Sequence, residues 1–172
     1  MKILRQEPSN TSTRFTRFFI YGTLKTNGPN HHVIHRKVHL IQKAYAYGLL
    51  KMIPEGYPAL LVPEEYALAS GSIDLYHDLN TEHDFMWIST NLTAIATTQW
   101  KRVEGELMTF NHPIATMAAL DRYEDYHPFD ESLYLRKLIV CIGEDHTKYP
   151  AWTYTITPDR IGISQPLDSF PI

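Results

Sequence analysis

A helix that carries two carboxylates is the segment of this sequence best suited to acid–base chemistry. Pro113 fits the first position of a helix because its missing N–H costs nothing there, and we predict a helix from Pro113 to about Tyr123 or Glu124. One face of this helix is an apolar stripe, formed by Ile114, Met117, Ala118 and Leu120. Glu124 falls on the same face, with Asp121 close by. The spacing therefore aims a carboxylate at the apolar side of the helix.

Glu124 is the candidate general base or acid. Partial withdrawal of a carboxylate from water disfavours its charged form and raises its pKa, which suits proton transfer near neutral pH. In the alternative interpretation, Glu124 lies at a fraying helix end and pairs with Arg102 or Arg136. The helical wheel alone also leaves open whether Asp121 or Glu124 transfers the proton.

A glycine loop after the first predicted strand is the second candidate feature. Residues 17–21 are an apolar, aromatic and β-branched run that stops at Gly22. Glycine lets backbone N–H groups turn outward, and donors gathered at a turn can bind a carboxylate or an oxyanion. The alternative is an ordinary strand-to-helix connection. Gly22 and Gly28 do not form a phosphate-loop or dinucleotide-binding pattern.

Four histidines raise the question of a metal site. His31, His35 and His39 are spaced four apart, and His32 is adjacent to the first. The segment holds no acidic residue and lacks the His-Glu-x-x-His pattern, so we predict a surface row of histidines and no bound metal.

Cys141 and three tyrosines could act in chemistry or binding, but each could also serve only in packing. Cys141 lies within the apolar run 138–142, where core packing explains it better than nucleophilic catalysis. Tyr21, Tyr134 and Tyr154 each fall in a predicted strand that can border one cavity. Packing with a single hydroxyl partner is the alternative for each tyrosine.

The elements that must position these residues are mostly strands. We predict strands at 17–21, 44–50, 57–62, 103–110, 134–142 and 151–156, and a short helix over 31–38 with Asn30 as its N-cap. The apolar residues of 64–102 follow neither a helical nor a strand period for long. We expect a short strand near 72–75 and another element near 85–88. Because several strands follow one another without a helix, we predict an α+β fold, a small mixed β-barrel or strongly curved sheet flanked by a few helices.

Length and composition limit the function classes. The 172 residues fit a single domain, which we place at 17–157 after a polar leader at 1–16 and before a tail at 158–172. A net charge of −3 offers no general attraction for nucleic acid, and no apolar run is long enough for a membrane span. One cysteine permits no internal disulfide, which favours a reducing, cytoplasmic location. The expected partner is a small molecule; the sequence does not define an oligomeric state.

Four motifs in order resemble the γ-glutamylcyclotransferase-like (AIG2-like) family, which includes γ-glutamylamine cyclotransferases. They are Phe19-Ile20-Tyr21-Gly22-Thr23-Leu24-Lys25 with Gly28-Pro29-Asn30-His31; Gly48-Leu49 with Gly56-Tyr57-Pro58-Ala59-Leu60; Val103-Glu104-Gly105-Glu106-Leu107; and Leu120-Asp121-Arg122-Tyr123-Glu124 with Tyr134-x-Arg136. Together they span residues 17–60 and 103–140.

The resemblance implies a small mixed β-barrel with a cavity over the glycine loop, and a reaction without metal or organic cofactor. Family members release an amine or amino acid from a γ-glutamyl compound while the glutamyl part closes to 5-oxoproline. The family's catalytic glutamate maps onto Glu124, and its substrate-holding loop maps onto Tyr21, Gly22, Thr23 and Leu24. We add Tyr134 as a substrate-binding candidate.

The sequence also departs from the family pattern. The segment 64–102 is long for this family and reads as an insertion, and residues 125–131 form a longer loop than compact members carry. The substrate therefore stays open among γ-glutamylamines, γ-glutamyl amino acids, glutathione and γ-glutamyl-protected intermediates. The competing interpretation is a catalytically silent binding or interaction protein on the same fold.

Overall fold

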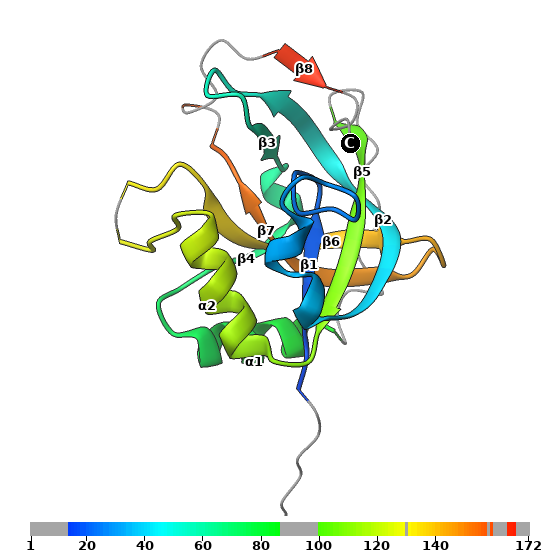
Figure 1. Ribbon diagram of the computed structural model, residues 1–172, viewed down its shortest axis with the longest axis vertical. Helices are drawn as coiled ribbons and strands as arrows, with labels where there is room; N and C mark the ends of the chain where they lie inside the picture. The colour runs from blue at the N-terminus through cyan, green and yellow to red at the C-terminus, as the bar shows by residue number, and fades with distance from the viewer. Residues whose placement is uncertain (1–13, 87–99, 130, 158, 160–164, 168–172) are drawn as a thin grey trace, which may run out of the picture.

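Five strands close a β-barrel in the computed structural model, which describes residues 14–86, 100–129, 131–157, 159 and 165–167. They are β1 (Thr16–Ile20), β2 (Val38–Met52), β5 (Lys101–Phe110), β6 (Leu135–Gly143) and β7 (Lys148–Thr155). The barrel order is β2-β5-β1-β7-β6, and β6 pairs back onto β2 at Ala44↔Gly143 (Figure 1). Only β1 and β7 pair in parallel among these neighbours. The mixed α+β barrel is therefore confirmed.

Three short strands extend the barrel. β3 (Pro58–Leu61) and β8 (Gln165–Leu167) both pair with the last residues of β2, and β4 (Ala67–Ser70) pairs with β6. β8 lies within the segment predicted as a tail, at the top of Figure 1.

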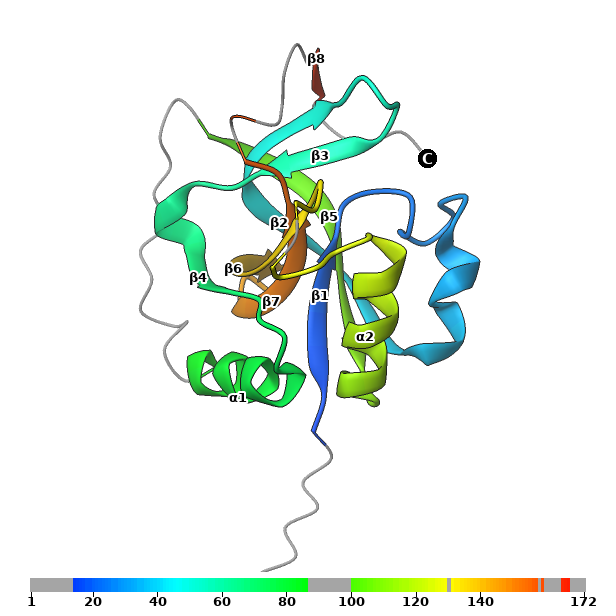
Figure 2. The ribbon, with the colours of Figure 1, turned by 90° about the vertical axis from the view of Figure 1, so that its left-hand side faces the viewer.

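The core has two parts because both faces of the barrel strands are covered. Alternate residues fill the barrel interior, among them Phe19, Ala44, Leu107, Cys141 and Ala151. The opposite face of β1 packs in the second part, with α2 (Pro113–Tyr123). Figure 2 shows α2 alongside β1, with α1 (Leu75–Phe85) near the lower end of that strand. Within the described residues, no helix combines the length and the apolar character needed to cross a membrane.

Two expectations for local structure are wrong. Residues 31–38 do not form one continuous helix: two single-turn 3₁₀ helices, η1 (His31–Val33) and η2 (His35–Lys37), lead directly into β2. Asn30 makes no side-chain capping bond, and only Ile34 of the segment is buried, so little stabilises a helical nucleus.

The expected strand at 72–75 is also absent. β4 lies earlier in the chain, after the 3₁₀ turn η3 (Glu64–Tyr66), and Leu75 begins α1. Asp74 caps that helix, since its carboxylate accepts hydrogen bonds from the backbone N–H groups of Tyr76 and His77. Most of the element expected near 85–88 lies outside the described residues, although Phe85 ends α1.

Candidate active site

Glu124 lies at the C-terminal cap of α2, and its backbone N–H donates to the carbonyl of Leu120. The helix begins with Pro113 at its first turn and buries Met117 and Leu120 of the predicted stripe completely. The apolar face therefore fixes the direction in which the side chain of Glu124 leaves the helix end.

The carboxylate of Glu124 has no counter-ion among the residues that the structure describes. Burial raises the pKa of this carboxyl from 4.5 to about 7. No hydrogen bond or ion pair to its oxygens occurs within the described chain. Arg102 pairs instead with Glu104 at 2.6 Å, and Arg136 pairs with Asp78 and Asp121, so the alternative ion pairs of Glu124 do not form. An unpaired carboxyl that titrates near neutrality is suited to accept and return a proton.

The glycine loop is held by its carbonyl groups. The carbonyl of Gly22 accepts from the N–H of Lys25, and the carbonyl of Thr23 accepts from the N–H of Asn30. The N–H groups of Gly22, Thr23 and Leu24 donate no hydrogen bond to any described residue. A turn whose acceptors are satisfied and whose donors remain available can hold an anion.

Gly28 keeps this loop closed. A Cβ atom there would lie 2.3 Å from the carbonyl oxygen of Thr23 and 2.8 Å from that of Lys25, distances that real Cβ atoms do not adopt. Only glycine therefore permits the close approach of the two limbs of the loop.

One pocket of about 510 Å³ brings these features together. It is lined by all six predicted site residues, Tyr21, Gly22, Thr23, Leu24, Glu124 and Tyr134. The Tyr21 hydroxyl donates to the carbonyl of Tyr154 at 2.7 Å, and the Tyr134 hydroxyl donates to the carbonyl of Pro58 at 2.9 Å. Burial raises the pKa of both phenols, so neither is positioned to ionise near neutral pH. The two tyrosines form walls whose polar ends are fixed by the backbone.

Several lining residues were not predicted as site residues, although Tyr57, Pro58 and Tyr123 belong to the motifs that resemble the family. Tyr57 and Pro58 come from the start of β3, Leu133 precedes β6, and Tyr123 closes α2, where its hydroxyl lies 3.4 Å from that of Thr23. Their positions follow from the closure of the barrel, and the local sequence pattern carries no signal for it. Asn30, which was predicted as a helix cap, also lines the pocket.

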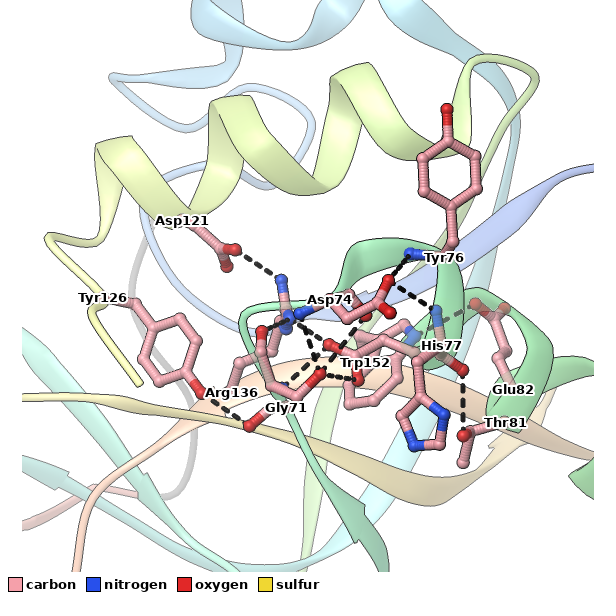
Figure 3. A network of polar contacts seen from close by, with 12 residues as sticks. Gly71, Asp74, Tyr76, His77, Thr81, Glu82, Asp121, Tyr126, Arg136 and Trp152 are labelled. Atoms are coloured by element: carbon pink, nitrogen blue, oxygen red, sulfur yellow. Dashed lines mark hydrogen bonds and ion pairs between the residues drawn. The ribbon is translucent and has the colours of Figure 1, made fainter. Parts of the chain in front are cut away.

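Asp121 lies on the same helix as Glu124 but faces a different environment (Figure 3). Its carboxylate accepts a hydrogen bond from Arg136, drawn in Figure 3. It also accepts one from the hydroxyl of Tyr154 at 2.7 Å. The fully buried Arg136 also donates to Asp78 of α1 and to the carbonyl of Ser72. Burial raises the pKa of the Asp121 carboxyl, against the opposing effect of the guanidinium. Asp121 thus holds α2 against β6 and β7, and its oxygens are occupied.

The histidines and the cysteine lie outside this pocket. The Nδ1 atoms of His31, His32 and His35 lie within hydrogen-bond distance of the carbonyls of Leu24, Pro29 and His32. In the described part of the chain, no three or more acidic, histidine or cysteine side chains form a group that could hold a metal ion. Cys141 is buried in the barrel interior, where desolvation raises its pKa to about 12.

Comparison with known proteins identifies the family. The sequence profile described as gamma-glutamyl cyclotransferase, AIG2-like, matches residues 18–80 and 76–169. The structure is similar to a crystal structure of an AIG2-like protein from Mus musculus, with a TM-score of 0.51 and 20% identity over 92% of this chain and 89% of that chain. At that identity the likeness shows a common fold. A search of curated proteins gave no match. Because the profile spans well over half of the 172 residues, the chain belongs to the AIG2-like gamma-glutamyl cyclotransferase family.

Proposed function

We propose that this protein cleaves a γ-glutamyl compound into 5-oxoproline and a free amine or amino acid, with Glu124 as the general base and acid. The observation that carries the proposal is the pocket itself, where an unpaired carboxyl and a loop with three available N–H donors face the same space. Family membership supports the reaction class.

The chemistry needs only these two features. The substrate's α-amine attacks its own γ-carbonyl carbon, so a new C–N bond closes the five-membered ring while the original γ-amide bond breaks. Glu124 takes the proton from the attacking amine and returns it to the departing nitrogen, so no water, metal or covalent enzyme intermediate enters the balance. Holding the amine against the carbonyl can supply about 7–11 kcal/mol of the barrier through orientation.

The loop at Gly22–Leu24 supplies the complementary part of the site in this proposal. Its N–H groups bind the substrate's carboxylate or stabilise the oxyanion that develops on the γ-carbonyl. Tyr21 and Tyr134, held through their hydroxyls, form the walls against which the glutamyl chain folds.

The charges of the pocket favour a leaving group without a carboxylate. Among the described residues that line the pocket, Glu124 and Asp125 are the charged ones, and both are acidic; none of these residues is a lysine or an arginine. A second carboxylate on the substrate would meet like charge with no cation to compensate. We therefore favour γ-glutamylamines over glutathione and γ-glutamyl amino acids.

The test measures 5-oxoproline release from a γ-glutamylamine and from γ-glutamylglutamate. Glu124→Gln keeps the size of the side chain but cannot accept a proton, so turnover of the wild type's preferred substrate falls by about 10²-fold or more. Glu144→Gln, an exposed carboxylate on the β6–β7 hairpin, serves as the control and leaves turnover unchanged.

Two results would contradict the proposal. Near-normal turnover in Glu124→Gln removes the mechanism, and silence of the wild type across a broad γ-glutamyl panel favours the alternative of a binding protein on the same fold. Faster turnover of γ-glutamylglutamate than of the γ-glutamylamine contradicts the substrate preference alone.

A further inference from the structure

A second hollow of about 470 Å³ lies at the other end of the barrel, and it shares no lining residue with the pocket of Glu124. Arg17, from β1, lies in it, whereas Tyr21, just past the end of the same strand, lines the first pocket. Residues four apart on a strand point to the same side and are separated by about 13 Å. The two hollows therefore open at opposite mouths of one barrel.

The guanidinium of Arg17 lies against two aromatic rings. Its central carbon lies 4.5 Å from the centre of the Phe15 ring and 5.0 Å from the centre of the Tyr149 ring. Among the residues that the structure describes, none accepts a hydrogen bond from this side chain or forms an ion pair with it. Two aromatic contacts orient the planar cation, and they leave the N–H groups at its edge available.

Two acidic side chains of neighbouring elements, Glu82 and Asp145, do not neutralise Arg17. Glu82 accepts a hydrogen bond from the backbone N–H of Arg17, but it is fully buried, and desolvation raises its pKa to about 8, so it is mostly uncharged at neutral pH. Asp145 is occupied at 2.7 Å by the hydroxyl of Tyr149 on the exposed hairpin. In the described part of the chain, no Asp or Glu lines the hollow, whereas the pocket at the other mouth is lined by two acidic residues.

Three uncharged polar side chains share the hollow with Arg17. They are Gln42 of β2, Thr109 of β5 and Asn111 just after β5. Over the described ranges, none of the three side chains makes a hydrogen bond to the protein. Each carries a donor as well as an acceptor oxygen, and His39 lines the same hollow, so donor-bearing side chains from neighbouring strands and strand ends surround Arg17.

We propose that this second mouth is a binding site for the oxyanion group of a small organic acid. The edge of a guanidinium matches the two oxygens of a carboxylate in a bidentate arrangement, and a half-buried cation gains more from such a partner than an exposed one does. The amide and hydroxyl donors complete the shell around the remaining oxygens. The site is independent of the proposed reaction, because it uses neither Glu124 nor the glycine loop.

NMR titration of the whole protein tests the site directly. Succinate, citrate and inorganic phosphate are added separately, with sodium chloride at matched ionic strength as the reference. We expect saturable shifts of the Arg17 Nε–H and of the side-chain amides of Gln42 and Asn111, at concentrations where chloride produces none. Comparison of the shifts with succinate or citrate and with phosphate then shows whether the site binds a carboxylate or a phosphate group.

Matched variants distinguish binding at this site from nonspecific electrostatic attraction to the protein. Arg17→Gln weakens binding at least about tenfold, as expected when a charge-assisted hydrogen bond is lost. Arg102→Gln removes a comparable arginine, one that lies 3.9 Å over the Tyr45 ring on the outside of the molecule, and leaves binding unchanged. Asn111→Ala changes an exposed position and weakens binding even if Arg17→Gln does not fold. Equal shifts with chloride, or full binding in both Arg17→Gln and Asn111→Ala, would overturn the proposal.

Discussion

The buried carboxyl of Glu82 makes a specific prediction about stability and pH. Glu82 is 0% exposed. It accepts hydrogen bonds from the Thr16 hydroxyl at 2.6 Å, the Arg17 backbone N–H at 2.8 Å and the Trp152 indole at 3.1 Å (Figure 3 includes the last). Desolvation outweighs these three bonds and raises the pKa of Glu82 from 4.5 to about 8. The side chain is neutral when folded at neutral pH and ionised when unfolded.

The sign of the effect follows from proton counting. Between pH 4.5 and about 8 the folded state holds a proton that the unfolded state has released, so the free energy of unfolding falls as pH rises. At 1.36 kcal/mol per pH unit, the contribution of Glu82 decreases by about 4 kcal/mol between pH 5 and pH 8. That is a large fraction of the 5–15 kcal/mol typical of a domain, and it corresponds to roughly 8–16 °C in Tm.

The assay compares urea unfolding of the wild type and of Glu82→Gln from pH 5 to pH 9. Glutamine cannot ionise, and its altered hydrogen bonding contributes an offset that does not change with pH. We therefore expect the wild type to lose about 4 kcal/mol relative to Glu82→Gln as pH rises. The exposed Glu65→Gln serves as the control, with a constant difference from the wild type. A pH-independent difference for Glu82→Gln, or a wild type that gains relative stability with pH, would refute the reasoning.

Three further predictions concern the site and its support. Arg136→Met leaves the carboxylates of Asp78 and Asp121 without their cation and lowers the free energy of unfolding by about 3–5 kcal/mol in urea unfolding, whereas the exposed Arg102→Met changes it by less than about 1 kcal/mol. Gly28→Ala forces a Cβ against the carbonyl of Thr23 and abolishes 5-oxoproline release in a protein that still melts cooperatively; normal release would show that the loop geometry is not needed. Finally, kcat/KM rises with pH through about 7 as Glu124 loses its proton, and a flat profile would contradict its role as the base.

The barrel strands were predictable because the pattern of buried residues in each strand can be seen in its local sequence. Residues 17–21, 103–110 and 134–142 are apolar or alternating runs, and each forms a strand of the barrel. The pairing of β6 with β2, which closes the barrel, joins residues about a hundred positions apart and leaves no local pattern. Closure nevertheless decides which residues meet Glu124, and for this reason Tyr57 and Leu133 were missed.

Helix α1 was missed because it buries acids. Its buried residues are Asp78, Leu79 and Glu82, a face that reads as polar in the sequence. Each carboxyl is accommodated by a residue from a distant strand, Arg136 of β6 for Asp78 and Trp152 of β7 for Glu82. An apolar stripe in the sequence usually indicates a helix that packs on a core. Helix α1 has no such stripe, because its buried face is held by polar contacts to residues that come close only in the folded protein.

The segment 64–102, whose structure was predicted least well, supports helix α2, which was predicted well. Sequence reasoning placed Asp121 and Glu124 on one helix face and could not separate their roles by periodicity. The structure separates them by partners: Arg136 and Tyr154 occupy Asp121, whereas Glu124 meets no cation among the described residues. Arg136 is itself held by Asp78 of α1, so the segment 64–102 contributes a carboxylate that holds in place the arginine bound to α2. Arg136 and Tyr154 thus hold Asp121 in place, and Glu124, three residues later on the same helix, is the carboxyl that lines the pocket without such partners in the described chain.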